Sequence, residues 1–570
     1  MNRKQRRAAT KQAPSANAAN PVSRLMAEAK LHEQRNKHDE AARAYRRILS
    51  LKPEFAEAHN SLALVLLAQG KRGEASMHFA RALTLVPQSL DQYRNACATL
   101  VAVLPAFGEA LQRLGILWPS RPSPEQLFAG GLATIAGDPL LLCLLQSAPV
   151  RDVGFERVFT ALRAALLARA AKDDSPSDAE LTFSCELAKQ CFNNEYVFTV
   201  TPEEDALLAH LSETLSASPT PFAVAAAAMY QPLHALSSAA ALLERKWPAA
   251  VDDVITQQVR EPRQEQDLRA SIPRLTPIDD DVSQQVREQY EENPYPRWVQ
   301  GPSGVTASAI DDFLRELAPT AAFAPLGKTE DLEILESGCG TGRHAIWVAQ
   351  RISGTRLLAV DLSLSSLAFA KRKTPADVAP RIDYAQGDIL KLGALGRSFD
   401  IVDASGVLHH MADPLEGWRI LLTLLRPGGF MHVGLYSELG RRDVVEARRF
   451  IAERGYKPTP QDIRRCRQDI LQTPLRSLTR FNDYFTMSEC RDLLFHVQES
   501  RTTIPAIKTF IAAQNLKFIG FEFDPPVLQK FRTLFANSGW SLSDLDRWHE
   551  VETKYPDTFS GMYQFWLQKP

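Results

Sequence analysis

The stretch from Leu332 to Ala345, LEILESGCGTGRHA, decides the fold of the C-terminal part of this 570-residue chain. Its first residues form an apolar run that predicts a β-strand, and the residues from His344 onward predict a helix. Gly338, Gly340 and Gly342 lie between them and let a ligand approach the backbone closely. A strand, a glycine turn and a helix in this order predict a nucleotide-binding crevice.

Two residues of this loop indicate which ligand it suits. Glu336 directly precedes the turn, where its negative charge would repel a pyrophosphate. Arg343 stands where a dinucleotide fingerprint has its third glycine. The loop, including Cys339, therefore favours a ligand without phosphates. A cationic ligand such as S-adenosylmethionine, with its ammonium and sulfonium, tolerates Glu336.

Further carboxylates follow at the spacing that such a ligand requires. Arg356 to Val360 predicts a second strand, and Asp361 after it can accept both ribose hydroxyls. Leu362 could then lie on one face of the adenine. Asp388, after a third strand, would accept from the adenine amino group. A neighbouring backbone N–H could serve a ring nitrogen, and Ile389 belongs to this expected contact set.

Five motifs in this order resemble those of class I S-adenosylmethionine-dependent methyltransferases, particularly the ubiquinone-biosynthesis type: ESGCGTG, AVDLS, QGDI, FDIVDASGVLHHMADP and LLRPGGFMHVGLYS. The resemblance implies an α/β fold with a Rossmann-like seven-stranded sheet over residues 282–570, and S-adenosylmethionine as cofactor. The alternative is a doubly wound fold that binds another ligand or none.

The resemblance also implies how the crevice is covered. DVSQQVREQYEENPYPRW predicts an amphipathic helix that would lie across it, so that Tyr290 either walls the cofactor pocket or docks the helix on the sheet. A helical cap is expected at about 437–513, over the acceptor pocket. Residues 441–480 hold 11 basic and 5 acidic side chains. They favour an anionic acceptor, although a solvated helix face explains the charges equally well.

Methyl transfer from a sulfonium is a displacement in which the protein mainly positions the two reactants and sometimes removes a proton. Neither a protein nucleophile nor a metal is needed, and we expect no metal site. His409 and His410, just past the predicted fourth strand, are the candidate general bases. Either histidine could equally line the pocket.

The N-terminal part predicts an all-α region. Residues 1–20 are basic and polar and predict a disordered tail. Residues 21–103 contain a 34-residue period, which resembles the tetratricopeptide repeat as in bacterial tetratricopeptide-methyltransferase fusions. The alternative is a generic pair of helical hairpins. The matched pairs are Ala29 and Ala63, Ala41 and Ala75, Tyr45 and Phe79, and Pro53 and Pro87.

Between the repeats and the methyltransferase-like region we expect a helical spacer domain at 104–259 and a polar, proline-bearing linker at 260–281. Neither segment shows a chemical constellation. The uncharged stretch from Thr214 to Leu243 is broken by prolines, which favours buried helices over a membrane span.

Composition excludes some classes of function. With 66 basic and 67 acidic residues, the net charge of −1 gives no overall attraction to nucleic acid. Seven cysteines without a C-x-x-C pair indicate reduced thiols in a cytoplasm, without disulfides or zinc.

Three functions compete. The first is a methyltransferase whose repeats recruit an unidentified acceptor or a protein partner. The others are an NAD-dependent oxidoreductase and a binding scaffold with an inactive cofactor-binding domain.

Overall fold

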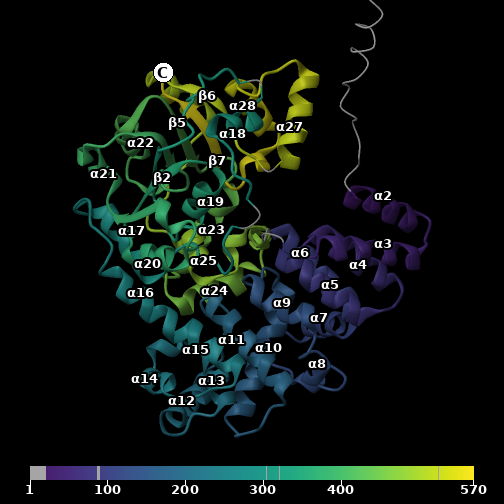
Figure 1. The fold of residues 1–570 in the computed structure, drawn as a ribbon. Helices are drawn as coiled ribbons and strands as arrows, with labels where there is room; N and C mark the ends of the chain where they lie inside the picture. The colour runs from purple at the N-terminus through teal and green to yellow at the C-terminus, as the bar shows by residue number, and fades with distance from the viewer. Residues whose placement is uncertain (1–20, 86–89, 303–304, 320, 524) are drawn as a thin grey trace, which may run out of the picture. The chain divides into compact units, whose positions relative to one another are not determined.

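The computed structural model describes residues 21–85, 90–302, 305–319, 321–523 and 525–570 (Figure 1). The predicted tail at residues 1–20 lies outside this part of the chain. The chain forms two compact units, one of residues up to 113 with 125–147, and one of 114–124 with 148–570.

The first unit is built from helices that pack on one another in succession. Alanines at the helix contacts are fully buried, as at Ala29, Ala41, Ala63 and Ala75. Such small side chains let neighbouring helices approach closely. The helices are α2 (Pro21–Gln34), α3 (His38–Leu51), α4 (Ala56–Ala68), α5 (Arg72–Leu85), α6 (Leu90–Val103), α7 (Pro105–Leu117), α8 (Pro124–Leu127) and α9 (Pro139–Ser147).

The 34-residue period coincides with this packing. Tyr45 on α3 and its equivalent Phe79 on α5 are both buried, like the alanine pairs. Pro87, the partner of Pro53, lies outside the described residues. Burial at equivalent positions is what the period requires, and the identification of these hairpins as tetratricopeptide repeats stays a prediction.

No single helix in the described segments is long and apolar enough to cross a membrane. One pair, Arg94–Val103 with Pro105–Leu117, passes the same test of length and composition when taken together, but it is bent by 109°.

The second unit begins with a helical region. Its helices are α10 (Val153–Ala170), α11 (Asp178–Asn193), α12 (Pro202–Ala217), α13 (Pro221–Ala228), α14 (Ala239–Leu243) and α15 (Ala249–Ile255), which continues through a π-helical turn (Thr256–Arg260) into α16 (Glu261–Arg269). The alanine-rich α13 is buried among α10, α11, α12 and α15.

The prediction of a linker at 260–281 is wrong, because this segment is packed structure. Helix α16 lies against α20 (Leu364–Lys373), whose Arg372 pairs with Glu261 at 3.0 Å and Glu265 at 2.8 Å. Arg274 then bridges to Gln386 at the edge of the sheet. The polar composition of the segment thus reflects ion pairing with the basic end of α20.

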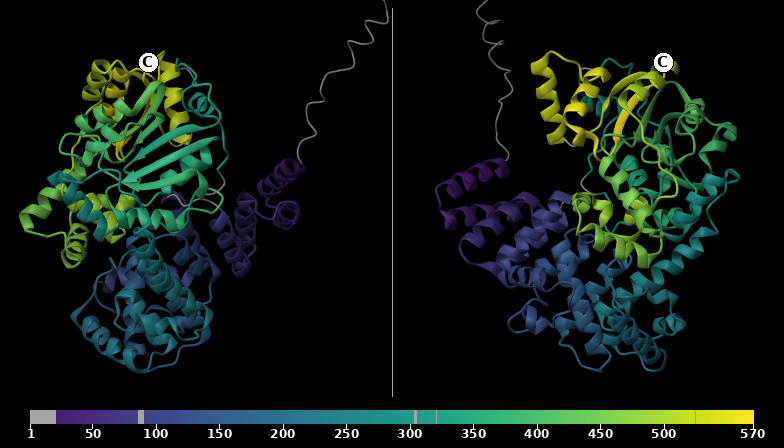
Figure 2. Two further views of the ribbon diagram at one scale, coloured as in Figure 1. Left: turned by 60° about the vertical axis from the view of Figure 1, so that its left-hand side comes forward. Right: turned by 180° about the vertical axis from the view of Figure 1, so that it is seen from behind.

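A seven-stranded sheet forms the centre of the C-terminal part, as predicted. Its strands are β1 (Leu332–Ser337), β2 (Thr355–Asp361), β3 (Ile382–Gln386), β4 (Phe399–Ala404), β5 (Leu425–Leu435), β6 (Lys517–Phe521) and β7 (Tyr563–Gln568). The order is β3-β2-β1-β4-β5-β7-β6, with β1 to β5 parallel and β7 antiparallel to both neighbours. The left view in Figure 2 shows the strands side by side.

Helices cover both faces of this sheet, which explains why its strands read as continuous apolar runs. One face packs on α18 (Ile310–Leu317), α19 (Arg343–Arg351) and α20. The other packs on α22 (Pro414–Leu424), α26 (Ile504–Ala513), α27 (Pro525–Ser538) and α28 (Leu545–Lys554). The carboxyl ends of β1 to β4 meet at one edge of the sheet.

Helices are inserted after β5, and we call this insertion the cap; it is shorter than the expected residues 437–513. It comprises α23 (Arg442–Arg454), α24 (Pro460–Ile470) and α25 (Met487–Phe495) with intervening 3₁₀ turns. Helix α26 instead buries Ile504, Ile507 and Phe510 in the core beneath the sheet. An apolar face of this kind packs on a sheet rather than over a pocket.

The cap docks on the helical region through a buried ion pair. Arg467 on α24 binds Glu156 on α10 with two hydrogen bonds of 3.0 and 2.7 Å, and their side chains are 1% and 6% exposed. Nearby, Arg464 donates to the Tyr196 carbonyl at 2.9 Å. The helical region from residue 148 onward is therefore part of the compact unit that contains the sheet.

Candidate active site

The glycine loop after β1 has a backbone that only glycine adopts easily. Gly338, Gly340 and Gly342 have φ values of 73°, 52° and 76°. A Cβ on Gly338 would lie 2.4 Å from Val407, and one on Gly340 would lie 2.6 Å from the Tyr295 carbonyl oxygen. The loop is thus a tight cradle, as its sequence predicts.

Asp361 at the end of β2 is joined directly to this loop. Its Oδ2 accepts from Gly340 N at 2.8 Å, and its Oδ1 accepts from Ser363 N at 2.8 Å. Burial raises the pKa of Asp361 to about 6, although these backbone donors oppose the rise. Carboxylate oxygens accept more than one hydrogen bond, so both remain able to bind ribose hydroxyls. Leu362 beside it is half-buried.

Two other predicted contact residues each hold a carboxylate oxygen that is buried without a hydrogen-bond partner in the described structure, Oε2 of Glu336 and Oδ2 of Asp388. Burial raises the pKa of both carboxyls. A buried unpaired acceptor is costly unless a donor reaches it. The ammonium and adenine amino group of S-adenosylmethionine are such donors, so these residues fit this cofactor.

The remaining predicted contact residues contribute in different ways. Cys339 is buried and its backbone N–H donates to the Val360 carbonyl, while burial raises the pKa of its thiol well above the usual value. Ile389 is buried beside Asp388. Tyr290, on α17 (Asp281–Glu292), accepts a 3.0 Å hydrogen bond at its carbonyl from Ser363 Oγ. The backbone of Tyr290 is therefore fixed next to the carboxyl end of β2.

A row of charged groups that the sequence analysis missed holds Glu336 in place. Glu336, Asp403 and His432 are register neighbours on β1, β4 and β5. His432 Nδ1 donates to Asp403 at 2.8 Å, and His344 Nδ1 lies 3.5 Å from Glu336 and 3.7 Å from Asp403. The sequence did contain a sign of this row, because β1, β4 and β5 each carry an ionisable residue within a largely apolar strand.

The members of this row shift the pKa values of one another. Burial opposes an imidazolium at His344, but Asp403 and Glu336 outweigh it and raise its pKa to about 10. Burial likewise opposes a carboxylate at Asp403, but His432 and His344 lower its pKa to about 2. His344 is thus cationic and fixes one oxygen of Glu336, leaving the other oxygen for a ligand.

The two candidate bases have different surroundings. His409 stacks on Tyr436 with ring centroids 3.7 Å apart, and its buried ring nitrogens lack a hydrogen-bond partner among the described residues. Burial and the neighbouring His410 lower the pKa of His409 well below its usual range. His409 is therefore held neutral against an aromatic ring.

His410 has a defined tautomer. Its Nδ1 lies 3.0 Å from the Gln498 carbonyl oxygen, which can only accept, so Nδ1 carries the proton. The lone pair is then on Nε2, which lies 4.0 Å from Asp492 Oδ1. Of the two predicted histidines, His410 is the one placed to accept a proton.

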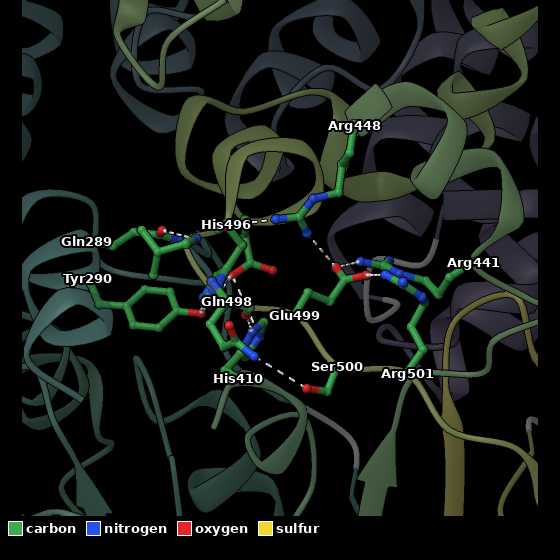
Figure 3. Close-up of polar contacts among 12 residues, drawn as sticks. Gln289, Tyr290, His410, Arg441, Arg448, His496, Gln498, Glu499, Ser500 and Arg501 are labelled. Carbon is green, nitrogen blue, oxygen red and sulfur yellow. Dashed lines mark hydrogen bonds and ion pairs between the residues drawn. The ribbon is translucent and has the colours of Figure 1, made fainter. Parts of the chain in front are cut away.

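A hydrogen-bonded network on α25 surrounds His410 (Figure 3). The Tyr290 hydroxyl donates to Asp492 Oδ1 at 2.6 Å and lies 3.1 Å from His496 Nε2. Gln498 N donates to His496 Nδ1 at 3.0 Å, so the His496 proton is on Nε2. Asp492 and His496, one helical turn apart, were missed because only the fold brings them to His410.

Two clusters bring three potential metal ligands within 4.8 Å of one another: His344 with Asp403 and His432, and His410 with Asp492 and His496. In the second, His496 Nε2 keeps its proton and offers no lone pair. In the first, the Nδ1–H of His432 already occupies Asp403. In each cluster at least one candidate ligand atom therefore carries a proton and offers no lone pair to a metal ion.

A family model described as a methyltransferase domain matches residues 335–433. Over 122 residues, the chain is 32% identical to a demethylmenaquinone methyltransferase of Clavibacter sepedonicus, covering 21% of this chain and 47% of that protein. Over 104 residues, it is 32% identical to a ubiquinone biosynthesis O-methyltransferase of Parvibaculum lavamentivorans, covering 18% and 40%.

Longer similarities have lower sequence identity. An uncharacterised protein of Synechococcus sp. is 28% identical over 239 residues, which cover 39% of this chain and 57% of that one. The structure of PKMT2 from Rickettsia typhi superposes at a TM-score of 0.35 with 14% identity, over 47% of this chain and 54% of that one. This TM-score is too low to transfer any property.

The chain spans about half the length of the curated relatives it matches. The matched residues 335–433 include the glycine loop, β2 to β4, Asp361 and Asp388. The similarity to a methyltransferase domain over residues 335–433 confirms the prediction of S-adenosylmethionine as the cofactor.

Proposed function

We propose that this chain transfers a methyl group from S-adenosylmethionine to an acceptor that binds between the glycine loop and the cap. The observation that carries the proposal is the pair of buried, unpaired carboxylate oxygens on Glu336 and Asp388 beside the glycine cradle. When bound, the cofactor supplies both the methyl group and its own leaving group.

The residues of the chain then have separate tasks. Glu336 binds the ammonium, Asp361 the ribose hydroxyls and Asp388 the adenine amino group. His410, with its lone pair on Nε2, accepts a proton from the acceptor where the reaction releases one. His409, neutral and stacked on Tyr436, shapes the wall of the acceptor site.

We also propose that residues 21–103 recruit the acceptor or a protein partner. Tethering makes the encounter intramolecular, with effective concentrations up to about millimolar. The proposal rests on the 34-residue period and on the burial of its matched positions.

Calorimetry tests the cofactor site. S-adenosylhomocysteine should bind and NAD should not, and Glu336→Gln should weaken binding of S-adenosylmethionine at least tenfold because a charge-assisted hydrogen bond is lost. Glu333→Gln is the matched control. It lies at the other end of β1, where Glu333 pairs with Arg426 at 3.2 Å. Equal effects of the two substitutions would contradict the assigned ammonium site.

Incubation with labelled S-adenosylmethionine and a cell extract tests the transfer itself. Label should appear in an acceptor with the parent chain and should be lost with Asp361→Ala. A chain that binds the cofactor but labels no acceptor in a single turnover would instead support a binding scaffold.

A further inference from the structure

Two hydrogen-bond acceptors face each other at the end of the His410 side chain. The Nε2 lone pair of His410 and the Oδ1 atom of Asp492 are 4.0 Å apart, too far for a direct hydrogen bond. Both groups are buried. A donor nitrogen about 2.9 Å from each atom would satisfy both, provided that it carries at least two N–H groups.

A second carboxylate reinforces this arrangement. Asp483, on the 3₁₀ turn Asn482–Tyr484, is half-buried, and no ion pair within 4.0 Å neutralises it in the described part of the chain. Burial and the neighbouring Asp492 raise the pKa of Asp483 to about 6. The charges of Arg441 and Arg151 oppose this rise without forming an ion pair to Asp483. A positively charged ligand next to the two carboxylates would stabilise them further.

Tyr295 connects these acids to the cofactor loop. Its carbonyl accepts from Thr341 N at 3.3 Å, and its ring stacks on Tyr290 with centroids 6.1 Å apart. Asp483 and Asp492 both act on the Tyr295 hydroxyl through their charges and raise its pKa, after burial. Tyr295 is therefore bonded to the glycine loop through its backbone and influenced by both acids at its hydroxyl.

The two cap arginines nearest to this region, Arg441 and Arg448, share an anionic partner. Arg441 and Arg448 pair with Glu499 at 2.7 and 3.2 Å (Figure 3). The Cζ atom of Arg441 also lies 3.7 Å from the centroid of the Tyr436 ring. Arg343 acts on Glu489, and Arg151 acts on both Glu489 and Asp483, in each case without an ion pair within 4.0 Å among the described residues. The basic composition of the cap therefore does not make this part of it an anion site.

We infer that the acceptor is an amine, which binds as an ammonium with its N–H groups directed at Asp492 Oδ1 and His410 Nε2 and with Asp483 nearby. The inference rests on the proposed methyl transfer. An alcohol has one O–H and leaves one of the two acceptors unpaired, whereas a protonated amine supplies both donors.

The proton balance follows from the same geometry. One ammonium proton passes to His410 Nε2, which gives an imidazolium opposite the Asp492 carboxylate. The amine lone pair thus freed forms the nitrogen–carbon bond to the methyl group, and the electrons of the broken carbon–sulfur bond stay on sulfur. The products are a methylated ammonium, S-adenosylhomocysteine and a protonated His410.

Sinefungin is the probe, because it carries an amino group where S-adenosylmethionine has its sulfonium methyl group. Calorimetry should show that the parent chain binds sinefungin at least tenfold more tightly than S-adenosylhomocysteine near neutral pH. Asp492→Asn should reduce this preference to less than about threefold with unchanged affinity for S-adenosylhomocysteine, and Asp483→Asn should reduce it partly. Asp469→Asn, an exposed carboxylate on α24 that pairs with Arg454, should leave it intact.

The outcomes separate this inference from the proposed function. No binding of S-adenosylhomocysteine to the parent chain would overturn the cofactor site and the inference together. Binding without a preference for sinefungin, or a preference that survives both Asp492→Asn and Asp483→Asn, would overturn the amine site alone. Retained affinity for S-adenosylhomocysteine shows that each variant is folded.

Discussion

Replacing Arg467 by methionine should release the cap from the helical region. The substitution keeps an unbranched side chain but removes both hydrogen bonds to Glu156, at 3.0 and 2.7 Å. It also removes the donors to the Tyr484 carbonyl at 2.9 Å and the Val197 carbonyl at 3.3 Å. A buried carboxylate and two carbonyls are then left without this partner.

The size of the effect follows from burial. Because the two side chains are 1% and 6% exposed, solvent does not replace the lost partner. Breaking a buried ion pair on one side costs about 3–5 kcal/mol. A factor of ten corresponds to about 1.4 kcal/mol, so local opening of α24 should become about a hundredfold to several thousandfold more frequent.

Hydrogen exchange resolved by segment measures this opening without requiring two-state unfolding of the whole chain. Amides of α24 should exchange faster in Arg467→Met, while those of β1 and β4 should be little changed. Arg465→Met is the matched control on the same helix. Its partner Asp462 lies at 3.4 Å and Arg465 is 72% exposed, so its loss should cost less than about 1 kcal/mol.

A second substitution at Glu156 tests the cause. With Glu156→Leu added to Arg467→Met, no buried charge is left unpaired, and α24 should regain part of its protection. Unchanged exchange in Arg467→Met, or a double variant that opens more than the single one, would refute the assignment of this pair as the docking contact.

Three further outcomes are expected. Asp361→Ala should weaken binding of S-adenosylhomocysteine by about 1.5–3 kcal/mol per lost charge-assisted hydrogen bond, and unchanged calorimetric affinity would place the ribose elsewhere. In the parent chain this affinity should fall as the pH drops through about 6, because the pKa of Asp361 is raised to about 6 and protonation removes its charge; a flat profile would contradict this role. A fragment from about Asp280 to Pro570 should be less soluble than one from Leu114 to Pro570, because it lacks Glu156, the buried partner of Arg467. If gel filtration shows the two fragments to be equally soluble, the docking of the cap on the helical region is dispensable.

The parts of the site that are local in sequence were predictable. The turn at Gly338, Gly340 and Gly342 follows from backbone conformations that glycine permits, and Asp361 and Asp388 follow from their position directly after apolar strands. Parallel strands bring their carboxyl ends to one edge, so residues that terminate successive strands must meet there. Local sequence therefore carries the geometry of the cofactor site.

The groups that act at long range were not predictable in the same way. Asp492 and His496 reach His410 only because the cap folds back over the sheet, across about eighty residues of chain. Nothing near Glu156 in the sequence identifies Arg467 as its partner. The segment at 260–281 shows the opposite error, since a polar composition that is typical of linkers here serves ion pairs with Arg372.

Tyr290 has a consequence for the order of events in catalysis. Its carbonyl is held from the cofactor side by Ser363, and its hydroxyl is held from the acceptor side by Asp492. One residue, through its backbone carbonyl and its side-chain hydroxyl, thus contacts groups of both proposed sites. If the cofactor, by ordering Tyr290, strengthens binding of the acceptor by some factor, the acceptor must strengthen binding of the cofactor by the same factor. Initial-rate kinetics should then show synergistic binding of the two ligands, and Tyr290→Phe, which keeps the ring but frees Asp492, should make their binding independent.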